Sequence, residues 1–499
     1  FWIRPAGLCE HCPQRHFCAL DGMATCPPPR AMGWLERYMH TVPNCNVIIA
    51  SHVVGGLMDS ATFERAVQAT AARHPQLRSV IDKERAAFVE LEGFVPGPDH
   101  VEVVDASGSE EWKAIADRES NADADVYGPR PLWRIILVRC ASHGSGANAL
   151  LVKFHHCIGD GSSGYVITHD VLRFYRRLEE HGDVGDVGAL PRLPSADRLA
   201  FPDGIGSDAS PAADALLEQF TRRRCSWSPS PGLPFDRKVG GAHNSTLYRD
   251  GSHESAEALL AQCRKRGLTM GAVFVAGTYF AIARMDPGFK RRALIDAKTP
   301  FSFDFDMDVN LRKRLQTVLG DDHVGTLIGM MSFSLSLTGE TRFWDFVAEV
   351  RKAMTDFLES KCHLYYFDVN ERFDAVCESM PAFQENLKRN NGLVQDMNFS
   401  SFGRYFFDPK HGHLSIDRMY ATGGGWCPTF GSCVFLILGL SSNFYTFVYS
   451  TSDENSQVAA DFFNTAVDFI ESTHKRSDSY RLVDWISEGL SAEGRRGGA

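Results

Sequence analysis

The stretch KFHHCIGDGSSG, residues 153–164, gathers side chains whose types and spacing are suited to chemistry. His155 and His156 stand side by side, and Asp160 and Gly161 follow after three intervening residues. An unperturbed imidazole titrates near neutral pH, so it can take a proton from a hydroxyl group and later return it. The same letters contain GDGSSG, which fits the G-x-G-x-x-G pattern of dinucleotide-binding loops. Proton transfer, phosphate binding, metal binding and a purely structural loop are the interpretations to compare.

Phosphate binding by this loop is disfavoured. In a dinucleotide-binding fold the glycine loop follows its strand directly, whereas here residues 155–158 intervene. Asp160 would also place a carboxylate where the helix N-terminus should receive an anion. No apolar strand with a terminal acidic residue follows at the required distance.

Metal binding by His155, His156 and Asp160 is disfavoured by local geometry. Neighbouring side chains of an extended segment point to opposite sides, so two adjacent histidines rarely bind one ion. The chain also lacks an H-E-x-x-H helix and a G-x-S-x-G nucleophile elbow. A structural role for one histidine stays open, but a polar cluster at the end of an apolar strand favours function. We therefore prefer general-base catalysis by one histidine, while the other supports the loop.

The elements around the motif follow from hydrophobic periodicity. Residues 131–140 and 148–157 are apolar runs separated by a Gly/Ser turn, and they predict two neighbouring strands. Residues 162–180 carry apolar side chains at helical spacing, and Ser162 or Ser163 is a candidate N-cap. The motif is thus the loop between a strand and a helix. Gly161 would allow the tight backbone path before the helix.

Predicted strands and helices alternate through both halves of the chain. A helix is predicted to begin at residue 58 and to end at His74-Pro75. The other predicted elements are strands at 46–55, 327–337, 433–440 and 444–450, and helices at 255–285 (split near Gly267), 341–360 and 457–473. The segment 181–211 is rich in Gly, Pro, Asp and Ser and is typical of a linker.

The letters HHCIGDG match H-H-x-x-x-D-G, and on this motif the chain resembles the CoA-dependent acyltransferase superfamily. That group includes chloramphenicol acetyltransferase, peptide-synthetase condensation domains, alcohol acetyltransferases and polyketide-associated acyltransferases. Further segments agree, namely PRAMGWLERYM (29–39), ARHPQLRSVI (72–81), DVLRFYRRL (170–178), DVNLRKRL (308–315) and VGTLIGMMSFSL (324–335). The resemblance covers roughly residues 29–475. The D-F-G-W-G and N-V-P-G-P segments of two other branches are missing, which favours the alcohol acetyltransferase and polyketide-associated branch.

The resemblance implies an α/β fold of two chloramphenicol-acetyltransferase-like subdomains, each a mixed sheet with flanking helices, in a V around a central tunnel. The organisation expected from it is a disordered Cys-rich extension (1–28), an N-terminal subdomain with the motif (29–190), a linker (191–240), a C-terminal subdomain (241–475) and a tail (476–499).

The resemblance also implies the chemistry. His156 would deprotonate an acceptor alcohol, whose oxygen attacks the thioester of acyl-CoA, the co-substrate; no permanently bound cofactor and no metal are expected. His155, Asp160 and Gly161 would be structural, with Arg312 as the partner of Asp160. Other candidates are Asn398, Ser400 and Ser401 for oxyanion or substrate contacts, and the basic groups at 264–266 and 312–314 for CoA phosphates, although such groups are more often solvated. The alternative is a stand-alone condensation enzyme that uses a carrier-protein thioester and forms an amide or an ester.

Composition narrows the function classes further. The formal charge of −10 and the absence of a long basic run argue against nucleic-acid binding. No apolar run is long enough for a transmembrane segment. Most of the cysteines are scattered singly, which is typical of reduced thiols and predicts a cytoplasmic protein, expected to be a monomer. Cys9, Cys12, Cys18 and Cys26 could hold zinc, but the second pair lacks zinc-ribbon spacing and the exit CPPPR is typical of a linker.

Overall fold

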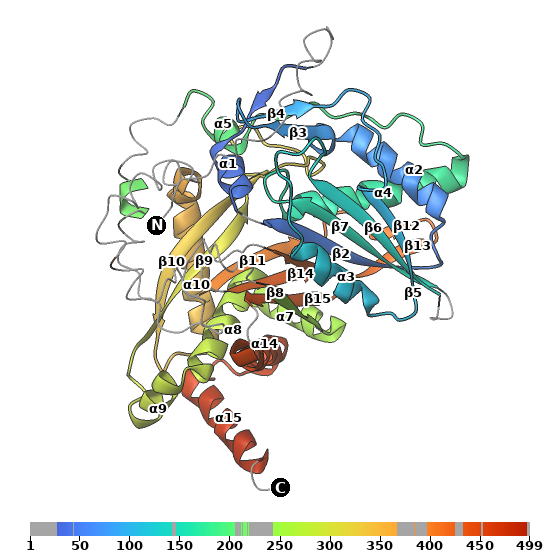
Figure 1. The fold of residues 1–499 in the computed structure, drawn as a ribbon. Coiled ribbons are helices and arrows are strands. Elements are labelled where there is room, and N and C mark those ends of the chain that lie inside the picture. Colours follow the sequence, from blue (N-terminus) through green and yellow to red (C-terminus); the bar gives the residue numbers. More distant parts are fainter. Residues whose placement is uncertain are drawn as a thin grey trace.

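The computed structural model describes residues 27–42, 44–141, 146–204, 211, 213–216, 218, 243–366, 385, 397–424, 433–450 and 453–496. The cysteines predicted as a candidate zinc cluster, and much of the predicted linker at 191–240, lie outside these residues. Two mixed sheets dominate the fold, with helices packed on their faces (Figure 1). The predicted α/β class with two sheets and flanking helices is therefore confirmed.

The first sheet has the strand order β12-β13-β2-β7-β6-β5. Its strands are β2 (Asn46–Val54), β5 (Val101–Ala106), β6 (Trp133–Cys140), β7 (Ala147–His155), β12 (Lys410–His411) and β13 (Leu414–Gly423). All neighbours are antiparallel except β5 and β6. Helices α2 (Ser60–Arg73) and α4 (Gly161–His181) pack together on one side of it, while α3 (Glu111–Ser120) packs on the other.

The second sheet has the strand order β10-β9-β11-β14-β15-β8. Its strands are β8 (Asn244–Asp250), β9 (Phe301–Asn310), β10 (Ile328–Leu337), β11 (Met397–Arg404), β14 (Cys433–Gly439) and β15 (Asn443–Ser450). The helices of this half are α7 (His253–Arg266), α8 (Met270–Met285), α9 (Pro287–Ile295), α10 (Phe343–Glu359), α14 (Asp453–Ser472) and α15 (Leu482–Arg496). The remaining elements near the N-terminus are β1 (Arg30–Ala31), α1 (Trp34–His40), β3 (Ser79–Asp82), β4 (Ala87–Glu90) and α5 (Ala196–Ala200).

Local sequence signals predicted several helix boundaries correctly. The side chain of Asp59 accepts a hydrogen bond from Thr62 N–H (2.9 Å) and caps α2, which ends before His74-Pro75 as predicted. Gly267 separates α7 from α8 in the left-handed conformation (φ +63°) that favours glycine. Among the described residues no single helix has the length and apolarity to cross a membrane; α7 and α8 meet the criterion only together, and they are bent by 107°.

Two features depart from the expected domain boundaries. Strand β13 comes from the C-terminal half of the chain but pairs with β2 in the first sheet, so residues 241–475 do not form a separate unit. The expected tail at 476–499 contains α15, whose Leu482, Trp485 and Ile486 are buried. Because these apolar side chains recur at helical spacing, they form one face of the helix, and that face packs against α8 and α9.

Strand β9, FSFDFDMDVN, positions the functional face of the second sheet. Its alternation sends Phe303, Phe305 and Met307 into the apolar core. The intervening polar residues, which include Asp308 and Asn310, therefore share the opposite face. Strand β11 runs parallel beside β9, with Asn398 in register with Asp306.

We predict that the buried face of α15 stabilises the second subdomain. Leu482→Ala should lower the free energy of unfolding by about 2–5 kcal/mol, because Leu482 is fully buried and its loss leaves a cavity. Leu490→Ala, on the same helix but 40% exposed, is the matched control and should change it by less than about 0.5 kcal/mol. Urea unfolding measures both values; equal effects would show that α15 does not pack as described.

Candidate active site

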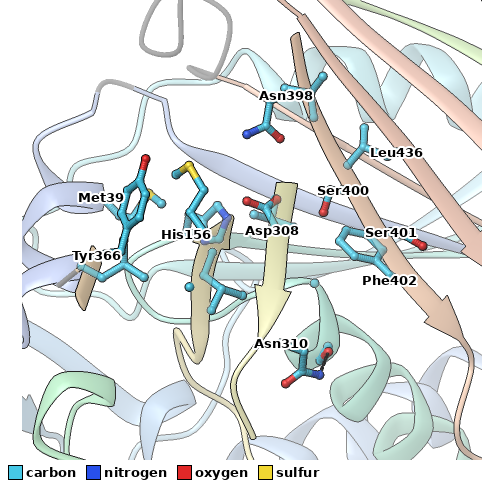
Figure 2. Close-up of a pocket in the computed structure, with 18 residues that line it drawn as sticks. Met39, His156, Asp308, Asn310, Tyr366, Asn398, Ser400, Ser401, Phe402 and Leu436 are labelled. Carbon is cyan, nitrogen blue, oxygen red and sulfur yellow. Dashed lines mark hydrogen bonds between the residues drawn. The ribbon is translucent and has the colours of Figure 1, made fainter. Parts of the chain in front are cut away.

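The two histidines of the motif have different surroundings. The ring of His155 is buried, and its Nδ1 accepts a hydrogen bond from Cys157 N–H (3.3 Å) at the end of β7. Burial lowers the pKa of His155 to about 3, so this ring is neutral at physiological pH. His156 follows, and its backbone N–H donates to the carbonyl of Cys45 (2.7 Å). Its ring lines a cavity, as Figure 2 shows.

Asp160 stabilises the loop through hydrogen bonds and an ion pair. Its carboxylate caps α4 by accepting hydrogen bonds from Ser163 N–H (2.8 Å) and Ser163 Oγ (2.9 Å), so the N-cap is Asp160 and not Ser162 or Ser163. Arg312 donates to both carboxylate oxygens (2.8 and 3.0 Å), and Leu327 N–H donates as well (3.0 Å). Arg312 thus pairs with Asp160, as the resemblance implied.

The electrostatics of Asp160 follow from this pairing. Burial opposes its ionisation, but Arg312 and the hydrogen bonds from Ser163 outweigh burial and lower the pKa of Asp160 below its usual value. Both members of the pair have fully buried side chains. Arg312 therefore cannot reach a CoA phosphate, and the expectation that included it among the phosphate-binding groups is wrong. Arg266, another of those groups, is engaged by Asp478 and lies over the Trp344 ring.

Gly161 serves close packing and not an unusual backbone conformation. Its φ is not among the positive values of the described residues. A Cβ at this position would collide with the ring of Phe402 on β11. The loop from the first subdomain and the strand from the second therefore approach closely because Gly161 has no side chain.

The cavity at His156 is built by both subdomains. The first supplies Leu35 and Met39 of α1, Val47 of β2, His156 and the start of α4. The second supplies segments of β9, β10, β11 and β14. The lining includes the predicted candidates Asn398, Ser400 and Ser401, which lie with His156 around the same space (Figure 2). The sequence thus identified four residues that the fold brings together from positions far apart in the chain.

Sequence analysis missed Asp308, the acidic group of this cavity. Asp308 lies on β9 and points into the space beside His156 (Figure 2). Burial, together with the charges of Asp306 and Asp160, raises the pKa of Asp308 to about 7, although a hydrogen bond with Ser400 opposes the shift. The alternation of FDFDMDVN was the available signal, because it places acidic side chains on a face that cannot be the apolar core.

The His156 ring is suited to act as a base. Burial is the main cause that lowers the pKa of His156 below the usual imidazole value, while nearby backbone groups and Asp160 partly oppose it. The ring is therefore neutral at physiological pH, as a proton acceptor must be. Among the described residues, no cluster of three or more His, Cys, Asp or Glu side chains could hold a metal ion.

Comparisons with known proteins agree with this geometry. Residues 34–186 match the family model of the condensation domain. Of the solved structures, the first condensation domain of the calcium-dependent antibiotic synthetase, bound to a substrate analogue, gives a TM-score of 0.65 at 15% identity, over 92% of this chain and 99% of that one. The chain has the fold of the condensation-domain and CoA-dependent acyltransferase superfamily. The resemblance drawn from the motif is confirmed.

Two further solved structures, of proteins with different names, share this fold. Trichothecene 15-O-acetyltransferase from Fusarium sporotrichioides gives a TM-score of 0.63 at 11% identity, over 89% of this chain and 95% of that one. Polyketide synthase associated protein 5 from Mycobacterium tuberculosis gives 0.58 at 14% identity, over 90% and 98%. Among curated proteins, a linear gramicidin synthase from Brevibacillus parabrevis is 27% identical over 175 residues. That match covers 34% of this chain and only 2% of the synthase.

We predict that the Asp160–Arg312 pair stabilises the whole chain. Asp160→Ala should lower the free energy of unfolding by about 3–5 kcal/mol, because it leaves a buried guanidinium without its partner. The control is Asp468→Ala, which breaks the pair of the largely exposed Asp468 with Arg249 and should cost less than about 1 kcal/mol. Denaturant unfolding gives both values; an Asp160→Ala protein with unchanged stability but no activity would indicate a direct chemical role for Asp160.

Proposed function

We propose that this chain moves an acyl group from acyl-CoA to the hydroxyl group of an alcohol, with His156 as the general base. The observation that carries the proposal is the His156 ring in a cavity whose opposite wall, from the second subdomain, presents Asn398 and Ser400. The superfamily fold supports acyl transfer in general. The O-acetyltransferase among the structural neighbours supports a hydroxyl acceptor.

The chemistry needs one proton transfer in each direction. Neutral His156 would accept the hydroxyl proton while the acceptor oxygen bonds to the thioester carbonyl carbon. The carbon–sulfur bond then breaks, and the imidazolium returns the proton to the departing thiolate. An ester and a free thiol result, and His156 is neutral again. No acyl-enzyme is required, because two bound substrates already gain from proximity.

The charge that develops on the carbonyl oxygen needs a hydrogen-bond donor. Asn398 has an amide N–H₂ group and Ser401 a hydroxyl group, and both line the cavity. Ser400 is already hydrogen-bonded to Asp308, so it is better placed to hold that carboxyl group. We assign the oxyanion role to Asn398, because strand alternation directs the Ser401 side chain to the other face of β11.

A second candidate is amide formation from a carrier-protein thioester. The condensation-domain match supports it, and so does Asp308. An amine acceptor arrives as an ammonium ion and must lose two protons to become an amide, whereas a hydroxyl group loses one. His156 can hold one proton, and an ionised Asp308 could take the other.

His156 should be far more important for rate than His155. His156→Ala should lower the single-turnover rate by roughly 10²–10⁴-fold, the usual contribution of a general base. His155→Ala should reduce the rate less and the stability more, since its buried ring is held by the loop backbone. Transfer to an alcohol, measured with acyl-CoA and in parallel with an acyl-carrier protein, gives the rates and separates the two donors.

The pH profile provides an internal control for this assay. The wild-type rate should fall as pH drops, with a midpoint below 6.5, because the pKa of His156 is lowered and only the neutral ring accepts a proton. Full rate in the His156→Ala protein would refute general-base catalysis by this residue.

Asp308 separates the two acceptor classes. If amines are the substrates, Asp308→Asn should lower kcat/KM for hexylamine by about 10–100-fold and leave that for hexanol within about threefold. The wild-type amine profile should then rise with pH through an inflection near 7, the pKa of Asp308, and the variant should lose it. Equal losses with both acceptors would instead mean that Asp308 only shapes the cavity.

The partners and the location of the chain are part of the same proposal. We propose a monomer that needs acyl-CoA and an acceptor, with the carrier protein as the alternative donor. The described cysteines, such as Cys157 and Cys263, form no disulfide, which supports the cytoplasmic location in this proposal.

A further inference from the structure

A second cavity lies on the opposite face of the first sheet from His156. In β2, Val47 lines the cavity at His156, whereas His52 and Val54 point to the other side and line the second one. Its volume is about 330 Å³, and α3 and β13 complete its walls with Trp112 and Asp417. This size falls in the range of small-molecule sites.

Three buried polar atoms of this cavity have no hydrogen-bond partner. They are Nε1 of Trp112, Nε2 of His52 and Oδ1 of Asp417. The Trp112 side chain is only 2% exposed, and its ring borders the cavity. An unmade hydrogen bond of a buried group costs about 1–3 kcal/mol, so the Trp112 N–H and His52 Nε2 favour a bound molecule that supplies the missing partners, while the Asp417 side chain is 40% exposed and also meets solvent.

A backbone irregularity in β13 places these groups close together. Strand β13 has a β-bulge at Asp417, between Ile416 opposite Val53 and Arg418 opposite His52. A bulge inserts one residue and redirects its side chain, and bulges are frequent beside binding sites. The rings of His52 and Trp112 meet edge to face at 4.9 Å, so all three groups border the same space.

We propose that this cavity binds a small uncharged molecule carrying a primary carboxamide beside an apolar ring. The Trp112 N–H is only a donor, so the ligand must offer an acceptor, which the amide oxygen provides. The unpartnered Oδ1 of Asp417 accepts hydrogen bonds, so the ligand must also donate, which the amide nitrogen does. Val54, Val138 and Ala149 give the ring an apolar floor.

The charges around the cavity disfavour ionic ligands of similar shape. A carboxylate would face Asp417 and Glu110 and could not donate to either. Arg418 is already paired with Asp250 (3.5 Å) and with Oδ2 of Asp417 (3.8 Å), which leaves Oδ1 of Asp417 for the ligand. An amidinium would suit the acids but offers no acceptor to Trp112. Neutral His52 completes the set, because burial lowers its pKa to about 4 and its Nε2 can serve either as donor or as acceptor.

Benzamide, benzoate and benzamidine form an isosteric probe series for this test. The full chain is labelled with ¹⁵N-tryptophan, and Trp112→Phe assigns the indole signal of Trp112. Benzamide should shift that signal in a saturable manner, while benzoate and benzamidine should bind at least about tenfold more weakly. Asp417→Ala should weaken benzamide binding by about tenfold or more, the value of one hydrogen bond to a charged group. Asp356→Asn, an exposed position on α10, is the matched control and should bind as wild type does.

Three outcomes would overturn the proposal. They are the absence of a saturable shift with benzamide, equal or tighter binding of either charged probe, and unchanged benzamide binding in a folded Asp417→Ala protein. The binding of the three probes to the wild-type protein tests the proposal even if the Asp417→Ala protein does not fold. His156→Ala should bind benzamide normally, so the result does not depend on the proposed acyl transfer.

Discussion

The buried ion pair between Asp160 and Arg312 holds together the parts on which the site depends. Asp160 belongs to the loop after β7, and Arg312 follows β9 in the second subdomain. Two desolvated charges tolerate little change in geometry, since either one alone in the interior would be costly. The pair therefore fixes the distance between the histidine loop and the sheet that faces it. Thr326, whose hydroxyl donates to the carbonyl of His156 (2.8 Å), adds a second tie between the same two segments.

The cavity brings the neutral His156 ring of the first subdomain beside a carboxyl group of unusual pKa from the second. His156 and Asp308 are both shifted toward their neutral forms, and burial is the first cause for each. Water-poor surroundings strengthen the interactions that a reacting carbonyl would make with Asn398. In the proposed reaction the first subdomain would provide the proton acceptor, and the second would provide the polar groups that contact the substrates.

Strand β13 connects the two halves more closely than the order of the sequence indicates. It leaves the second half of the chain and pairs with β2, so the first sheet is completed by residues 414–423. Its bulge at Asp417 also shapes the second cavity. One crossing strand therefore stabilises the junction of the subdomains and supplies part of a separate pocket.

The sequence alone determined the strand–loop–helix of the motif and the strongly periodic helices, because these depend on contacts between near neighbours. Its motif also indicated the superfamily fold. It also identified His156, Asn398, Ser400 and Ser401, which the fold gathers around one cavity. It did not determine the role of Gly161, the place of Asp308, the course of β13 or helix α15. Those depend on pairing between residues far apart in the chain, such as Asp306 beside Asn398 in the second sheet. Side-chain alternation shows that a face exists, but only the tertiary structure decides what that face meets, because strand register is set by packing across the whole sheet.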